Sequence, residues 1–159
     1  MISRYTHPDM AQVWTDKNRF QKWLEVEIAV CDVLAQNGEI PSDAAIRIRE
    51  NASFSVDRIR EIEKITHHDV VAFTTAVAET LGPESRFVHL GLTSTDVVDT
   101  AQALQVREAS HLIEGAMLEL KKMLQIQAEK YRDTVMMGRT HGIHAEPISL
   151  GLKFAVWYA

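Results

Sequence analysis

The sequence predicts an all-α fold, in which several short helices precede one very long helix. Apolar residues recur at spacings of three and four through most of the chain, which is typical of amphipathic helices. The segments between these stretches are rich in Gly, Pro, Ser, Thr, Asn and Asp, the residues that begin and end helices. One stretch, from residue 94 to about 132, keeps the helical spacing without any stop signal.

Composition and charge exclude several classes of function. The chain has 159 residues, of which 46% are apolar and 25% charged, as in ordinary soluble globular proteins. The formal net charge of -5 argues against nucleic-acid binding, which needs clustered Lys and Arg. Cys31 is the single cysteine, so no intrachain disulfide forms, and its apolar neighbours predict a buried position.

The chain is expected to be cytoplasmic and not bound to a membrane. Its N-terminus carries Arg4, His7 and Asp9 where a signal peptide needs an apolar core. No stretch approaches the roughly 20 apolar residues of a membrane-spanning helix.

The first elements are an extended arm and an amphipathic helix. Residues 1–15 show no sustained period and include Pro8, so we expect an arm without regular structure. A helix is predicted over 16–37, where Asn37-Gly38 ends it. Its apolar stripe consists of Phe20, Trp23, Leu24, Ile28, Cys31, Leu34 and Ala35.

Two shorter helices follow, each with a serine in position to cap it. Ser42 is expected to cap a helix that ends near residue 51, and Ser55 one over 56–65. Asp69 is a good N-cap for a further helix over 70–81. His67 and His68 therefore precede a helix start, where free N–H groups favour anions.

The long helix is too long for a globule of this size. It would span roughly 55 Å at about 1.5 Å per residue, whereas a compact chain of this length has a radius of gyration of about 15 Å. It therefore projects from a small body or joins a larger bundle with other chain segments or subunits. A fresh apolar helix over 148–159 stops without a cap, so we expect the N-terminal piece of a longer enzyme.

The segment Gly138 to Pro147 is dense in chemically active side chains. It holds two histidines, an arginine, a threonine and a glutamate, and its glycines and proline predict an irregular turn. Such a turn either only connects two helices or places reactive side chains at a functional site. Composition alone favours the connection, and the rest of the chain reverses that preference.

Three loops at helix boundaries carry a family resemblance. They are Thr66-His67-His68-Asp69, the string Gly-Leu-Thr-Ser-Thr-Asp-Val-Val-Asp-Thr from Gly91, and Arg-Thr-His-Gly-Ile-His-Ala-Glu-Pro from Arg139. Together with Ser3-Arg4-Tyr5, they resemble the N-terminal part of the adenylosuccinate lyases, within the fumarase/aspartase superfamily. The similarity spans essentially all 159 residues.

The resemblance implies a fold, an activity and an assembly. It implies an N-terminal helical domain over 1–92 and the start of the superfamily's long central helix bundle over 93–159. The implied activity is elimination of fumarate from adenylosuccinate to give AMP, and from SAICAR to give AICAR, without a metal or organic cofactor. The implied assembly is a homotetramer, in which loops of three subunits form each active site around a nucleotide substrate.

The resemblance also assigns proton-transfer roles. His141 matches the family's general acid, and Thr140 beside it contacts substrate; histidine suits this work because its ordinary pKa lies near neutral pH. His68 matches a second histidine near the substrate, and Asp69 accompanies it. His67 stands where many relatives have arginine, so a fixed positive charge is missing there.

Other matched residues would bind the substrate's anionic groups. Thr93 and Ser94 correspond to residues that hold a succinyl carboxylate, and Arg4 and Tyr5 to residues that hold the nucleotide phosphate. His89 is expected near the phosphate. The family's base is a serine on a loop farther along the sequence, so we expect these 159 residues alone to be inactive.

Three other interpretations stay open. The chain could belong to a superfamily lyase acting on argininosuccinate or on a simple dicarboxylate, in which case no phosphate anchor is needed at Arg4. It could be a helical assembly module whose loops are only connections. A metal site at His68, His141 and His144 is a third possibility, although Gly142 argues against the regular helix that this histidine spacing needs.

Overall fold

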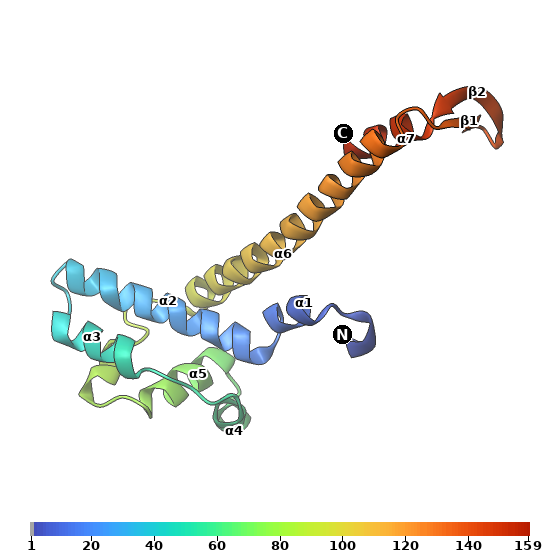
Figure 1. Cartoon of the computed structure of the whole chain (residues 1–159). Coiled ribbons are helices and arrows are strands. Elements are labelled where there is room, and N and C mark those ends of the chain that lie inside the picture. Colours follow the sequence, from blue (N-terminus) through green and yellow to red (C-terminus); the bar gives the residue numbers. More distant parts are fainter. Residues whose placement is uncertain (1) are drawn as a thin grey trace. The chain divides into compact units, whose positions relative to one another are not determined.

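The computed structural model describes residues 2–159, which are mostly helical (Figure 1). Contacts divide the chain into two compact units, Met1–Ala109 and Ser110–Ala159. In order, the elements are η1 (Ser3–Tyr5), α1 (Pro8–Val13), α2 (Asp16–Gln36), α3 (Ser42–Asn51), α4 (Val56–Thr66), α5 (Asp69–Ala78), η2 (Pro83–Phe87), α6 (Ser94–Lys130), β1 (Val135–Thr140), β2 (Ile143–Ser149) and α7 (Leu150–Tyr158). The predicted all-α class is confirmed, with one small hairpin added.

The core of the first unit is an aromatic cluster between α2 and α5. The ring of Phe20 stacks on that of Phe73 at 5.9 Å between centroids, and Trp23 meets both rings edge-on at 5.2 and 5.4 Å. All three side chains are buried, and such pairs add to the energy of burial alone. Further residues of α5, together with residues of α4 and α6, complete the cluster: Val70, Ala72, Ala76, Val77, Ile59, Ile62, Val97 and Ala101.

A second cluster joins α2 to α3 within the same unit. Cys31 packs with Ile40, Ala45 and Ile48, and all four side chains are buried. The predicted buried position of Cys31 is therefore confirmed. In Figure 1, α3, α4 and α5 lie on one side of α2.

The second unit combines the C-terminal part of α6 with a hairpin and α7. β1 and β2 pair antiparallel, and the register shifts between Met137 and Arg139. The extra residue of this bulge is on β2, and Gly138 lies opposite it, where an added Cβ would lie 2.5 Å from the carbonyl oxygen of Glu146. Gly151 lets α7 approach α6, because a Cβ there would lie 2.5 Å from the carbonyl oxygen of Ala128.

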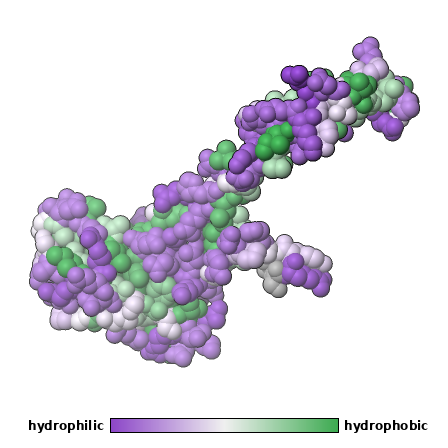
Figure 2. Space-filling model, in the orientation of Figure 1, coloured by the Kyte–Doolittle hydropathy of each residue, from purple (hydrophilic) through white to green (hydrophobic). Residues whose placement is uncertain are grey.

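Many apolar side chains on this second unit are exposed (Figure 2). A groove of about 580 Å³ runs between the side chains of α6 and the end of α7, and Ile113, Met117, Leu118 and Trp157 help to line it. No helix among residues 2–159 is both long and apolar enough to cross a membrane.

The helix boundaries agree with the sequence in most places. Thr15 and Ser55 cap α2 and α4 by accepting hydrogen bonds from the backbone N–H groups of Asn18 and Arg58. The long helix is present as the 37 residues of α6. The expected boundary between domains 1–92 and 93–159 stays a prediction.

Four expectations about local structure were wrong. Ser42 does not cap α3: it is the first residue of that helix, Pro41 occupies the N-cap position, and no side chain makes a capping hydrogen bond there. The arm contains α1, because Pro8 occupies the first turn of a helix, where its missing N–H costs nothing. Asp69 is the first residue of α5, and His68 is its N-cap. The segment Gly138 to Pro147 is largely a β-hairpin and not an irregular turn. Pro147 is tolerated in β2 because its nitrogen, which has no hydrogen to donate, is not required for a hydrogen bond to β1.

Candidate functional site

The first candidate loop joins α4 to α5. His67 ends α4 with a left-handed backbone, φ 53°, and its N–H donates to the carbonyl oxygen of Glu63 at 2.8 Å. His68 Nδ1 accepts from the backbone N–H of Val71 at 3.4 Å and lies 3.5 Å from Asp69 Oδ1. The neutral ring can therefore cap α5, whereas the protonated ring can pair with Asp69. Both arrangements leave Nε2 of this exposed side chain for a ligand.

The second candidate loop precedes α6. The backbone N–H of Thr93 donates to Asp96 Oδ2 at 2.8 Å, and the N–H of Asp96 donates to the carbonyl oxygen of Thr93 at 3.0 Å. This pattern resembles a capping box, in which the Asp96 carboxylate accepts one of the free backbone N–H groups at the start of α6. Within the described chain, the hydroxyls of Thr93 and Ser94 have no hydrogen-bond partner, which leaves them available to a ligand.

A buried carboxylate that sequence reasoning missed holds the same loop. Glu27 is only 1% exposed, and its Oε2 accepts the backbone N–H of His89 at 2.8 Å. Its Oε1 lies 2.7 Å from His89 Nδ1. A signal was present, because Glu27 falls on the apolar stripe of α2 between Trp23 and Cys31, where a charged residue needs a partner.

The arm with Arg4 and Tyr5 is exposed, and α1, which follows these residues, is held to the first unit by hydrogen bonds. The Arg4 guanidinium lies over the Tyr5 ring, 4.8 Å from its centroid, and both side chains are exposed. At the end of α1, the carbonyl oxygen of Val13 accepts from Asn18 Nδ2 at 3.0 Å and from Gln105 Nε2 at 2.7 Å. These two amides fix α1, and with it the origin of the arm, against α2 and α6.

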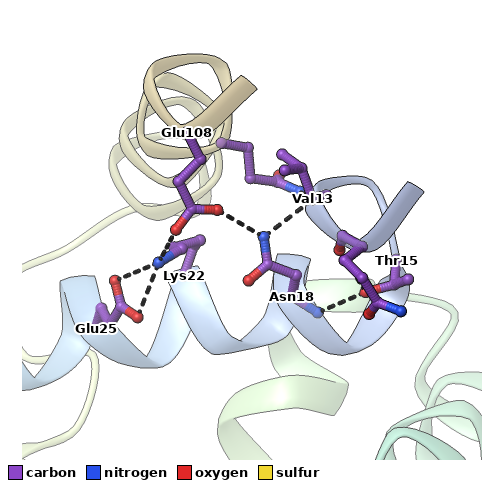
Figure 3. Close-up of polar contacts among 8 residues, drawn as sticks. Val13, Thr15, Asn18, Lys22, Glu25 and Glu108 are labelled. Atoms are coloured by element: carbon purple, nitrogen blue, oxygen red, sulfur yellow. Dashed lines mark hydrogen bonds and ion pairs between the residues drawn. The ribbon is translucent and has the colours of Figure 1, made fainter. Parts of the chain in front are cut away.

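An ion pair extends this network (Figure 3). Lys22 Nζ lies 2.5 Å from Glu108 Oε1 and 3.0 Å from Glu25 Oε2, while Asn18 Nδ2 donates to Glu108 Oε2 at 2.9 Å. Burial acts to lower the pKa of Lys22, but hydrogen bonds to Glu108 and Glu25 outweigh it and raise that pKa above its ordinary value. Burial acts to raise the pKa of Glu108, and hydrogen bonds to Lys22 and Asn18 reverse that effect and lower it.

The third candidate loop is the tip of the hairpin in the second unit. His141 and Gly142 have φ of 50° and 78°, the positive values that both central residues of a type I′ turn require. Thr140 pairs with Ile143 on either side of the tip. The side chains of Thr140 and His141 are exposed, so the tip presents a hydroxyl and an imidazole to a ligand.

The predicted site residues are thus distributed over both units. The first unit holds Arg4, Tyr5, His68, Asp69, His89, Thr93 and Ser94, and the second holds Thr140 and His141. The polar contacts of each loop stay within that loop or reach a neighbouring helix. Among residues 2–159, no three His, Cys, Asp or Glu side chains are grouped so as to hold a metal ion.

Three left-handed histidines mark these loops. Among residues 2–159, the only residues other than glycine with positive φ are His67, His89 and His141, one in each loop. This conformation is uncommon outside glycine, and histidine tolerates it better than most residues. Uncommon backbone conformations gather at functional sites, so their distribution supports the choice of these loops.

Known proteins resemble this chain in sequence. It is 52% identical over 158 residues to the adenylosuccinate lyase of Bacillus subtilis and 50% identical over 159 residues to that of Streptococcus mutans. These matches cover 99% and 100% of the chain but only 37% of each relative, so the chain spans little more than a third of their length.

Solved structures resemble it as well. A fumarate lyase from Mesorhizobium has a TM-score of 0.87 at 31% identity, and covers 94% of this chain with 36% of its own. A 3-carboxy-cis,cis-muconate lactonizing enzyme from Pseudomonas putida has a TM-score of 0.84 at 31% identity, over 97% and 37% of the two chains. The family profile described as "Lyase" matches residues 3–159, and the chain therefore belongs to the lyase family.

Proposed function

We propose that the protein to which these residues belong is an adenylosuccinate lyase of purine biosynthesis. It would release fumarate from adenylosuccinate to form AMP, and from SAICAR to form AICAR. The observation that carries this proposal is the identity of 52% and 50%, across essentially the whole chain, to two adenylosuccinate lyases. The Arg4-Tyr5 arm adds support, because a nucleotide substrate has a phosphate to be held and arginine suits that task.

The reaction requires a base, an acid and anion-binding groups. A base removes a proton from the carbon next to a carboxylate, the electron pair forms the new C=C bond, and the C–N bond breaks toward nitrogen. His141 would deliver the proton that the leaving nitrogen needs, because imidazole is a good acid near neutral pH. Its place at a turn tip beside Thr140 suits a group that enters a shared site.

The first unit would bind the substrate. His68, with Asp69 beside it at 3.5 Å, would orient the reacting part and assist proton transfer. The free hydroxyls of Thr93 and Ser94 at the start of α6 would hold a succinyl carboxylate, where the partial positive charge of a helix start favours anions. Arg4, Tyr5 and His89 would hold the phosphate.

The proposal includes the assembly. In a cytoplasmic homotetramer, loops from different subunits would come together in each active site. The central helix bundle of the tetramer would be formed by the chain from residue 93 onward. The exposed apolar side chains on α6 and α7 support this, because such a surface is typical of a protein interface. No metal or organic cofactor is required for the chemistry described.

A chimera would test the function. We would join residues 1–159 to the part of the Bacillus subtilis adenylosuccinate lyase that follows its matched segment, and measure conversion of adenylosuccinate by ultraviolet absorbance. We expect turnover, and His141→Ala should lower kcat by about a hundredfold or more. His111→Ala, on an exposed face of α6, is the matched control and should have little effect. A folded chimera without turnover, or full turnover with His141→Ala, would contradict the proposal.

A second candidate is a lyase for a simpler dicarboxylate. The likeness to a fumarate lyase and a muconate lactonizing enzyme, each at 31% identity, favours it. Arg4→Ala distinguishes the two, because only a nucleotide substrate uses that guanidinium. AMP inhibition of the chimera that is unchanged by Arg4→Ala would favour the dicarboxylate enzyme.

A further inference from the structure

We infer that Glu27 is a positioning residue, which holds the His89 ring so that only its Nε2 is presented to the phosphate of the substrate. The inference rests on the proposed function for the identity of the ligand. Its geometry rests on contacts within the first unit alone, between α2 and the segment that leads into α6 (Figure 1).

Both oxygens of the Glu27 carboxylate contact the same residue, His89. Oε2 accepts the backbone N–H of His89 at 2.8 Å, and Oε1 lies 2.7 Å from the ring Nδ1. The carboxylate therefore fixes the backbone and the ring at once. This matters because His89 has φ 65°, a left-handed conformation that needs support from its surroundings.

A neighbouring residue supports the same segment. Cys31, one helical turn after Glu27, donates its thiol hydrogen to the carbonyl oxygen of Phe87 at 3.5 Å. Burial raises the pKa of Cys31 to about 11, and the nearby Glu27 and Asp32 charges add to that effect, so the thiol keeps its proton. Glu27 and Cys31, on one face of α2, thus bind the residues on either side of Val88, namely His89 and Phe87.

The contact determines which ring nitrogen is free. An ionised carboxylate only accepts hydrogen bonds, so Nδ1 must carry a hydrogen. The remaining Nε2 belongs to a side chain that is 25% exposed, and it can take a proton and donate to an anion. A phosphate oxygen at Nε2 would place the imidazolium between two anions, as in other carboxylate–histidine pairs that orient a ring.

Glu27→Gln separates positioning from packing, because glutamine has nearly the same shape. Its amide oxygen can still accept the backbone N–H of His89, and its NH2 group then faces Nδ1. A ring that accepts at Nδ1 must carry its hydrogen on Nε2, so the tautomer should reverse. Glu25→Gln, on the same helix and partly exposed, is the control.

The first measurement uses the 159-residue chain and does not depend on activity. Ring nitrogen shifts of ¹⁵N-labelled histidine, with His89 assigned through His89→Gln, report the tautomer of the neutral ring. We expect hydrogen on Nδ1 in the parent and in Glu25→Gln, and on Nε2 in Glu27→Gln. Hydrogen on Nε2 in the parent, or an unchanged tautomer in Glu27→Gln, would overturn the inference.

The second measurement uses the chimera described above. Glu27→Gln removes the carboxylate that stabilises the imidazolium, so a neutral ring would face the phosphate. KM for adenylosuccinate should rise about tenfold and kcat should change little, because only binding is affected. His89→Gln should do the same, and the double variant should be no worse than either single one, since the two residues act as a unit. A fully additive double variant would overturn the inference. An inactive parent chimera would contradict the proposed function, while the tautomer measurement would still decide the role of Glu27.

Discussion

Gln105 of α6 donates its side-chain Nε2–H to the backbone carbonyl oxygen of Val13 at 2.7 Å, across ninety-two residues of sequence. The Gln105 side chain is buried, and the bond holds the end of α1 beside α6. Because the arm with Arg4 begins at α1, this pair links the start of the long helix to a proposed phosphate-binding residue. A core contact thereby limits where the arm can lie.

Gln105→Ala should destabilise the first unit. The variant loses one of the two donors to Val13 and leaves a cavity in a buried position, so we expect a loss of about 1–2 kcal/mol in the free energy of unfolding. Urea denaturation followed by circular dichroism measures it. Gln102→Ala, on the exposed side of the same helix, should change stability by less than about 0.5 kcal/mol. Equal effects of the two substitutions would contradict the assigned bond.

The Lys22–Glu108 pair should make stability depend on pH at both extremes. The raised pKa of Lys22 means that its contribution is complete below its unfolded value of 10.5 and is lost as pH rises through the folded value. The lowered pKa of Glu108 means that its contribution is complete above its unfolded value of 4.5 and is lost as pH falls through the folded value.

Lys22→Met should therefore cost about 1 kcal/mol at pH 8, a modest value because solvent screens the partly exposed Glu108. The difference from the parent, measured by urea denaturation, should shrink above pH 10.5. Lys17→Met, at an exposed position of the same helix, is the control and should have no such pH dependence. A constant cost for Lys22→Met from pH 8 to pH 11.5 would contradict the pairing.

Gly138→Ala should disrupt the hairpin, whereas Gly115→Ala should stabilise its helix. A Cβ at Gly138 would lie 2.5 Å from a backbone oxygen, and backbone cannot move aside as a flexible side chain does. Gly115 has nothing within 4 Å of an added Cβ and lies inside α6, so alanine should gain about 1 kcal/mol. Thermal unfolding of both variants tests the contrast, and a neutral Gly138→Ala would contradict the close approach.

The sequence predicted what depends on local side chains and missed what depends on distant pairing. The cap Ser55 bonds to the backbone N–H of Arg58, three residues away on its own helix, so its role could be predicted from the local sequence. The hairpin could not be predicted from the local sequence. Its turn places a histidine at positive φ and one strand contains Pro147, and both features argue against strands. Glu27 and His89 lie sixty-two residues apart, so only the odd carboxylate on an apolar stripe hinted at their contact.

His67→Gly should stabilise the first unit. His67 closes α4 in the left-handed conformation, which glycine adopts without the strain of a Cβ. Relief of that strain exceeds the greater flexibility of glycine in the unfolded chain, so we expect a gain of about 0.5–1 kcal/mol. Differential scanning calorimetry measures the shift in Tm. His67→Val, with a branched Cβ, should lower the Tm, and a loss of stability in both variants would contradict the prediction.

The 159-residue chain by itself should not turn over adenylosuccinate. In the proposed mechanism His141 supplies an acid for the leaving nitrogen, but a base is also needed for the carbon-bound proton. The family resemblance implies that this base is a serine farther along the sequence. Removing one of two proton-transfer groups costs several orders of magnitude in rate, so turnover should fall below about a thousandth of the chimera's. Ultraviolet assays of the chain and the chimera at equal concentration measure this ratio. Comparable rates would mean that the base lies within these residues and that the roles proposed for His68 and His141 must be reassigned.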